Sequence, residues 1–307
     1  MRTPPNSSGS RSLTEPDGQH RDGYDPTTVD QLVGEAANIL KAIGYASDHV
    51  VLIGGLVPGL LVPVLDPGLE PHVGTADIDL CLSVALVDGD TAEYQRIETE
   101  LKRLGFQEGD ATFRWIRDRN TGLPLTIEFF CPAAEGRPAG RTFRPPAATN
   151  PRAKYNLGGK LSALALEAGE LLTTDVEIIT RTVALPDNKG TFDATLRVTG
   201  PLAFLVAKAD ALTKRDKPKD AYDIVWLIES WQGGPAAAAD AFAARPAYTN
   251  PAVIRGLQEI AKAFSEPSTH GSRSYAQFSS RNVAEDAQLE LRAVGAVAEF
   301  MRALPPA

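Results

Sequence analysis

The sequence predicts an α+β protein, in which a mixed sheet with flanking helices is followed by a helical C-terminal half. Short runs of β-branched and aromatic residues alternate with helical periodicity up to residue 199, whereas the periodic segments after Pro201 are all helical. The chain has 307 residues, of which 43% are hydrophobic and 23% charged. This balance is typical of a globular protein with a large core and excludes a wholly disordered chain.

The first two thirds of the chain carry the expected strands. Apolar residues at three- and four-residue spacing predict a helix from residue 28, and the apolar run at 50–53 predicts a buried strand that ends at a glycine pair. The Asn-Thr-Gly sequence at 120–122 predicts a hairpin turn. In chain order we expect helices over 28–46, 56–65 and 91–104, a loop over 66–74, and strands over 50–53, 77–84, 113–116, 123–131, 176–184 and 191–199.

These elements divide the chain into three regions. Residues 1–27 have almost no sizeable apolar side chains, which predicts a disordered leader that is dispensable for fold and activity. Residues 28–199 form the sheet-containing domain, with a loop or junction rich in proline and arginine over 132–152. Residues 200–307 form a helical domain that completes the active-site cleft. Its helices are expected over 201–215, 219–231, 236–244, 251–264 and 283–303.

Charge and cysteine content exclude several classes of protein. The net charge of −8 argues against a protein that wraps nucleic acid, although residues 101–160 hold eleven Lys and Arg against five Asp and Glu and leave room for a local anion-binding surface. Two cysteines cannot build a disulfide framework or a structural zinc site. Without a membrane-length apolar run, a P-loop, a dinucleotide fingerprint or a nucleophile elbow, we expect a cytoplasmic protein that does not contact a membrane.

Paired carboxylates indicate a divalent-metal site. In a strand, Asp77 and Asp79 project from the same side, and two neighbouring carboxylates repel each other unless a cation lies between them. Mg²⁺ prefers such oxygen ligands together with substrate phosphates. Glu128 is a third acid, isolated among β-branched and aromatic residues where a charge needs a reason. Pairing of the expected strands over 77–84 and 123–131 would bring it to the same cleft as the two aspartates. An Asp-x-Asp pair alone is more often a solvated strand edge.

The glycine pair indicates a phosphate-binding turn. Gly54 and Gly55 lie between an expected strand and an expected helix, so that backbone N–H groups and the helix N-terminus can approach a polyphosphate. Taken alone, such a pair is more often only a tight turn. The combination of the glycine pair with the later aspartates is far more specific.

A second charged cluster lies at the start of the helical half. Lys208 and Arg215 share one helical face, and Asp220 and Asp223 share a face of the next helix. A salt-bridged helix hairpin with a capping aspartate would explain these residues without any chemistry, and the spacing alone does not decide between the two interpretations.

The glycine pair, the Thr75-x-Asp77-x-Asp79 motif and the charged motif Lys208-x6-Arg215-x3-Lys219-Asp220-x2-Asp223, in this order, resemble the AbiEii/AbiGii-type nucleotidyltransferases. This family belongs to the DNA polymerase beta-like superfamily and includes toxins of type IV toxin–antitoxin systems. The similarity covers roughly residues 30–230. It implies a polymerase beta-like nucleotidyltransferase domain, Mg²⁺ or Mn²⁺, a nucleoside triphosphate, and transfer of a nucleotidyl group.

The resemblance also implies roles for individual residues. The implied nucleotide-binding residues are Gly54, Gly55, Thr75, Lys208 and Arg215. The implied metal ligands, also catalytic, are Asp77, Asp79 and Glu128. Further catalytic candidates in the later motif are Asp220 and Asp223. The 21 residues between Gly55 and Asp77 exceed the usual interval, so we expect an inserted loop over 65–74.

Two hypotheses follow. The first is a nucleotidyltransferase that moves a nucleoside monophosphate to an acceptor hydroxyl on RNA, a protein or a small molecule such as an antibiotic, and acts as a toxin with an antitoxin partner. The second is a catalytically degenerate nucleotide-binding or interaction module, which the long interval favours. His72, within that interval, is interpreted as a loop histidine without a role.

Overall fold

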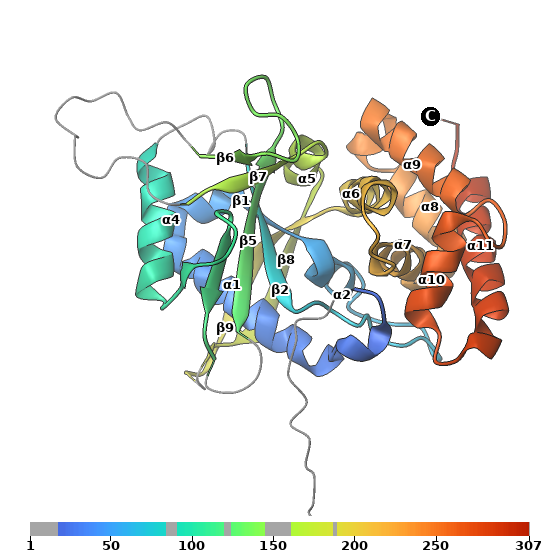
Figure 1. Cartoon of the computed structure of the whole chain (residues 1–307), viewed down its shortest axis with the longest axis horizontal. Helices are drawn as coiled ribbons and strands as arrows, with labels where there is room; N and C mark the ends of the chain where they lie inside the picture. Colours follow the sequence, from blue (N-terminus) through green and yellow to red (C-terminus); the bar gives the residue numbers. More distant parts are fainter. Residues whose placement is uncertain (1–17, 84–90, 120–123, 145–160, 187–188, 307) are drawn as a thin grey trace, which may run out of the picture.

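The computed structural model describes residues 18–83, 91–119, 124–144, 161–186 and 189–306. Within these residues a nine-stranded sheet with its flanking helices lies beside an array of C-terminal helices (Figure 1). The expected α+β class is confirmed. In this part of the chain, no helix combines the length and the apolar character that crossing a membrane requires.

The sheet is mixed, with strand order β3-β4-β5-β2-β1-β9-β8, and β7 joins β5 and β6 off this path. Strand β2 is antiparallel to β1 and parallel to β5, which places its residues at the centre of the sheet. The strands are β1 (Val50–Ile53), β2 (Asp77–Leu82), β3 (Gln107–Glu108), β4 (Arg114–Arg117), β5 (Leu125–Pro132), β6 (Thr142–Phe143), β7 (Ala163–Leu166), β8 (Val176–Ala184) and β9 (Thr191–Thr199).

The helices that precede the C-terminal half in the chain pack on the sheet or beside it. Helix α1 (Val29–Ile43) packs against β2, β8 and α4 (Thr91–Arg103), and its apolar stripe is buried as its periodicity predicts. Helices α2 (Val57–Leu61) and α5 (Gly169–Thr174) contact the C-terminal half, α2 through α7 and α5 through α6. These two short helices therefore connect the sheet to the helical half.

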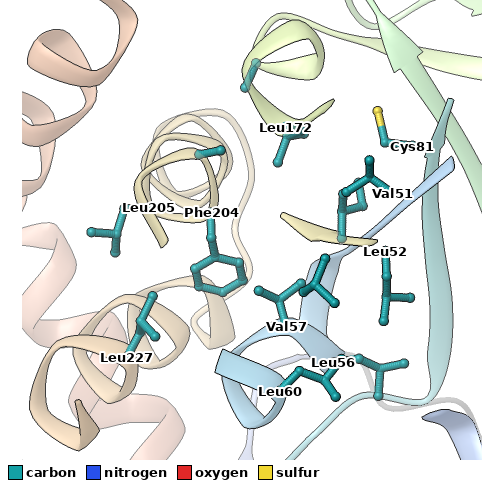
Figure 2. Close-up of a cluster of buried hydrophobic side chains, with 14 of the residues drawn as sticks. Val51, Leu52, Leu56, Val57, Leu60, Cys81, Leu172, Phe204, Leu205 and Leu227 are labelled. Atoms are coloured by element: carbon teal, nitrogen blue, oxygen red, sulfur yellow. The ribbon is translucent and has the colours of Figure 1, made fainter. Parts of the chain in front are cut away.

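The C-terminal helices pack on one another and on this connection. They are α6 (Pro201–Lys214), α7 (Lys219–Ser230), α8 (Gly234–Ala243), α9 (Pro251–Ala263), α10 (His270–Ser279) and α11 (Asp286–Ala303). Figure 2 shows Phe204 of α6 directed toward Val57 of α2, between the helical half and strand β1. One continuous hydrophobic core therefore includes residues of both halves.

Several expectations need correction. The disordered leader expected over 1–27 does not extend to residues 18–27, which contain two short helical turns, at Arg21–Gly23 and Pro26–Thr28. The helix expected over 56–65 ends at Leu61, because Pro63 disfavours helical backbone in the residue before it. Elements β7, α5 and α10 were not expected. The hairpin between β4 and β5 is confirmed by their antiparallel pairing, although its turn at 120–122 lies outside the described residues.

Candidate active site

Three carboxylates converge on adjacent strands. Asp77 and Asp79 lie on β2, and Glu128 of β5 is paired in register with Asp79. Each offers one oxygen atom, and these oxygens lie within 4.8 Å of one another. The sequence expectation that Glu128 joins the aspartate pair is therefore confirmed. Oxygen ligands at this spacing fit a hard divalent cation.

Asp79 is held in surroundings that disfavour its charged form. Burial, reinforced by the charges of Asp77 and Glu128, raises the pKa of Asp79 well above its usual value. The hydroxyl of Thr75 donates a hydrogen bond to Asp77. Three carboxylates that repel one another in a partly buried position would gain from a shared cation, so these residues fit a bound metal ion.

Arg114 was not expected at this site. It lies opposite Glu128 in the β4–β5 hairpin, and its guanidinium donates two hydrogen bonds to Oε1 of Glu128, at 2.8 and 2.5 Å. Asp110 lies 3.0 Å from the same guanidinium. Which residue of β4 lies opposite Glu128 depends on the length of the turn between β4 and β5, and this length could not be read from the sequence.

The glycine pair brings the backbone against the acids. Strand β1 ends at Ile53, opposite Asp79, and Gly54 has a φ of +73°, which disfavours other residues. A Cβ atom at Gly54 would lie 1.9 Å from Oδ2 of Asp79, and one at Gly55 would lie 2.7 Å from Cβ of Thr75. Both glycines are therefore required for Asp79 and Thr75 to approach the turn. The following helix α2 is only five residues long.

The second cluster faces this turn from α6 and α7. Nζ of Lys208 lies 2.8 Å from Asp220 and 2.6 Å from Asp223. Arg215 donates two hydrogen bonds to Asp220, at 2.8 and 2.9 Å. Burial alone would raise the pKa of Asp220, but Lys208 and Arg215 outweigh it and lower this pKa. The cluster is thus the salt-bridged helix pair of the conservative interpretation, and its cations also line the cleft.

Asp223 lies deeper than the other acids. Its side chain is 0% exposed and does not line the cleft, and it contacts Lys208, Lys219 and His72. Burial would raise the pKa of Asp223, but these neighbours hold it well below the usual value. Asp223 can therefore position the cations of the cleft without contacting a substrate.

His72 corrects the expectation of a loop histidine without a role. It is buried, its Nδ1 accepts a hydrogen bond from the N–H of Gly74, and its Nε2 therefore donates to Asp223 at 2.9 Å. The hydroxyl of Tyr222 accepts from the N–H of Val73. The long interval between the glycine pair and the aspartate pair is thus bound to α7, which holds the two halves together beside the site.

One cleft of about 410 Å³ connects these groups. It is lined by apolar side chains and by Gly54, Gly55, Thr75, the three acids, Arg114, Lys208, Arg215, Lys217, Lys219, Asp220 and Tyr24. Tyr24 was not expected as a site residue. Lys219 belongs to the charged motif, but the sequence assigned no role to it. The structure thus brings every site residue expected from the sequence, except Asp223, to the surface of a single cleft between the two halves.

A family model described as "Nucleotidyl transferase AbiEii toxin, Type IV TA system" matches residues 69–305, more than half of the chain. The chain belongs to this AbiEii family. It is therefore a nucleotidyltransferase, and the resemblance stated from its motifs is confirmed. The match includes all five candidate acids and excludes Gly54 and Gly55, whose place in the site is given by geometry alone.

Solved structures show more distant similarity. A nucleotidyltransferase-like antigenic protein from Paracoccidioides brasiliensis is 15% identical, with 78% of this chain and 89% of that chain covered and a TM-score of 0.42. MenT4, a nucleotidyltransferase toxin from Mycobacterium tuberculosis, is 16% identical, with 92% and 88% covered and a TM-score of 0.36. The curated proteins contain no match to the chain.

Proposed function

We propose that this AbiEii-family chain is a Mg²⁺-dependent nucleotidyltransferase that moves a nucleoside monophosphate from a nucleoside triphosphate to an acceptor hydroxyl. The observation that carries the proposal is the convergence of Asp77, Asp79 and Glu128 in one cleft with the Gly54–Gly55 turn. Mn²⁺ would serve in place of Mg²⁺ because it accepts the same oxygen ligands.

The three acids would hold the metal. When bound, a divalent cation at these carboxylates lowers the cost of the negative charge that develops during phosphoryl transfer. Burial and the charges of Asp77 and Glu128 raise the pKa of Asp79. This supports the assignment, because a shared cation relieves the repulsion among the three acids.

The remaining residues would bind and orient the nucleotide. The turn at Gly54 and Gly55 offers backbone close to the acids, and Lys208 and Arg215 present positive charge from the opposite wall. We assign to Asp220 and Asp223 the positioning of these cations, since both aspartates are buried and paired with them.

The reaction balances without a further reagent. The acceptor oxygen attacks the α-phosphorus, a new P–O bond forms, and the bond from the α-phosphorus to the bridging oxygen of the β-phosphate breaks. Pyrophosphate leaves with the negative charge, and the hydroxyl proton passes to a carboxylate or to water. Cations at the pyrophosphate end stabilise this leaving group more in the transition state than in the bound substrate.

We favour RNA as the acceptor and a toxin–antitoxin pair as the context. Lys217 lines the cleft beside the cations of α6 and α7 and adds positive charge, which suits a polyanionic acceptor. An antitoxin would bind the intact chain as its protein partner. The convergence of the acids argues against a degenerate module, because groups that repel one another are costly to keep without a ligand.

Label transfer tests the proposal. The full chain is incubated with Mg²⁺, bulk RNA and each nucleoside triphosphate labelled at the α- or the γ-phosphate. We expect label to enter RNA from the α-labelled nucleotide only, and EDTA to prevent it. Asp77→Asn should abolish transfer, whereas Asp240→Asn, at an exposed position of α8, should leave it unchanged.

The outcomes are distinct. Transfer of the γ-label would contradict nucleotidyl transfer, and equal transfer by Asp77→Asn would remove the acid site from the chemistry. Label on the protein itself or on an added aminoglycoside, with none on RNA, would replace the RNA acceptor by a side chain or an antibiotic.

A further inference from the structure

Lys219 lies at the glycine turn, although the charged motif drew attention to Lys208 and Arg215. Its Nζ lies 3.3 Å from the position that a Cβ atom at Gly55 would occupy. Of the three described atoms nearest to that position, it is the one that carries a positive charge. The Lys219 side chain is 4% exposed and lines the same cleft. Its ammonium group is therefore placed where a phosphate bound to the turn would contact it.

The charges around Lys219 leave room for an anion. The paired cluster on α6 and α7 contains three cations, Lys208, Arg215 and Lys219, but two carboxylates, which belong to Asp220 and Asp223. The carboxylate of Asp223 pairs with both Lys208 and Lys219. The Lys219 ammonium group has three N–H donors, and one of them is directed to Asp223. Burial accordingly lowers the pKa of Lys219, which Asp223 only partly offsets. A buried cation in this position gains from a second anionic partner.

Tyr24 covers the same ammonium group from outside the expected domain. Nζ of Lys219 lies 5.3 Å from the centre of the Tyr24 ring, within the range of a cation–π contact. The ring also packs edge-on against Phe278 of α10, at 5.7 Å between ring centres. The helical half therefore holds Tyr24 beside Lys219 in the cleft.

The segment before Tyr24 follows the turn that carries Lys219. The carbonyl of Gly18 accepts a hydrogen bond from the N–H of Lys219 at 3.1 Å, and the side-chain amide of Gln19 donates to the carbonyl of Asp216 at 3.0 Å. These contacts hold the segment against the turn before α7, and within the segment Tyr24 lines the cleft.

We propose that Lys219, covered by the ring of Tyr24, binds the terminal phosphates of the nucleoside triphosphate at the Gly54–Gly55 turn. This inference rests on the proposed function and names the cation that holds its substrate. It also makes Tyr24 part of the nucleotide site. AMP lacks the terminal phosphates, so its binding does not depend on Lys219.

Calorimetry on the full chain with Mg²⁺ tests this assignment with three probes: inorganic tripolyphosphate, ATP and AMP. Lys219→Met keeps the length of the side chain and removes its charge. We expect it to weaken tripolyphosphate and ATP at least about tenfold, the scale of a hydrogen bond to a charged group, and to change AMP less than about twofold. Lys214→Met, at an exposed lysine of α6, is the matched control and should bind all three probes as the wild type does.

A purely structural role for Lys219 predicts a different pattern. It would lower the melting temperature and leave the ratio of ATP to AMP affinity unchanged, which would overturn the proposal. If Lys219→Met does not fold, Tyr24→Leu and Tyr24→Phe decide. We expect Leu to weaken tripolyphosphate by about threefold or more and Phe to match the wild type, because Phe keeps the ring face. Equal affinity in both variants contradicts the proposal.

Failure of this inference and failure of the proposed function give separate results. A wild-type chain that transfers α-label, together with a Lys219→Met chain that binds ATP equally well, overturns this inference alone. A wild-type chain that binds tripolyphosphate through Lys219 but transfers no label contradicts the proposed function alone.

Discussion

Nε2 of His72 lies 2.9 Å from Oδ1 of Asp223, and this hydrogen bond joins the long interval after the glycine pair to helix α7. The imidazole ring also packs against Tyr222 and Trp226 of the same helix, at 5.2 and 4.9 Å between ring centres. The interval that the sequence marks as an insertion is therefore part of the interface between the two halves. It positions Asp223 and, through it, Lys208 and Lys219.

The first prediction concerns the pH dependence of stability. Burial lowers the pKa of His72 to about 4, from 6.5 in an unfolded chain. Between these values the unfolded state binds a proton that the folded state does not. The neutral, buried His72 therefore contributes its full share to the free energy of unfolding above pH 6.5. This share, about 3 kcal/mol in total, is lost as the pH falls from 6.5 to 4. Denaturant unfolding at pH 7.5 and pH 5 should show a smaller difference for His72→Gln than for the wild type. The variant His49→Gln, at an exposed histidine, should show the same difference between the two pH values as the wild type. If His72→Gln also shows the wild-type difference, this account is wrong.

The second prediction concerns the cost of the acid cluster. Asp79→Asn removes a partly buried carboxylate whose charged form Asp77 and Glu128 repel, so the melting temperature of the metal-free protein should stay level or rise. The same change should abolish Mn²⁺ binding, measured by calorimetry, and label transfer. A strong loss of stability in Asp79→Asn, relative to the exposed Asp240→Asn, would mark the aspartate as structural.

The third prediction compares alanine substitutions at two nearby glycines, Gly54 in the turn and Gly59 in the helix α2 that follows it. Gly54→Ala would place a Cβ atom 1.9 Å from Asp79, at a φ of +73°, and should cost about 1–3 kcal/mol of stability and weaken Mn²⁺ binding. Gly59 of α2 has no heavy atom within 4 Å of the position that a Cβ would take. Gly59→Ala should therefore be neutral or stabilising by up to about 1 kcal/mol. Equal effects of the two changes on unfolding would refute the close approach of Asp79 to the turn.

The sequence predicted those parts of the fold that follow from local patterns. Strand β1 and the helices α6 and α7 agree with their expected bounds within a few residues, because apolar periodicity and Pro218 mark them. The convergence of Glu128 with Asp79 was predicted from strand pairing, which the register confirms. These features need only the period of each element and the order of the elements.

The parts that were missed depend on contacts distant in the chain. His72 and Asp223 are 151 residues apart, and no local pattern shows that the loop packs on α7. Helix α10, with the sequence HGSRSYAQFS, has few strong helix formers and is held by burial of residues such as Tyr275 and Phe278. Tyr24 is the one Phe, Trp or Tyr residue in the polar leader. Its large apolar ring is the one local feature that could have indicated the packing of this segment on α10.

The last prediction concerns residues 18–27, which the sequence suggested to be dispensable. They bury part of Tyr24 against Phe278, pair Arg21 with Glu70, and supply the carbonyl of Gly18 to the N–H of Lys219. A chain that starts at Thr28 loses these contacts, and it should melt several degrees lower, since each 1 kcal/mol corresponds to about 2–4 °C in a chain of this size. A chain that starts at Gly18 keeps all three contacts and is the control. Thermal melting of the two truncated chains beside the full chain measures the difference. If the two truncated chains melt together, the segment contributes no stability, and its contacts with α10 and with the turn before α7 do not hold it in place.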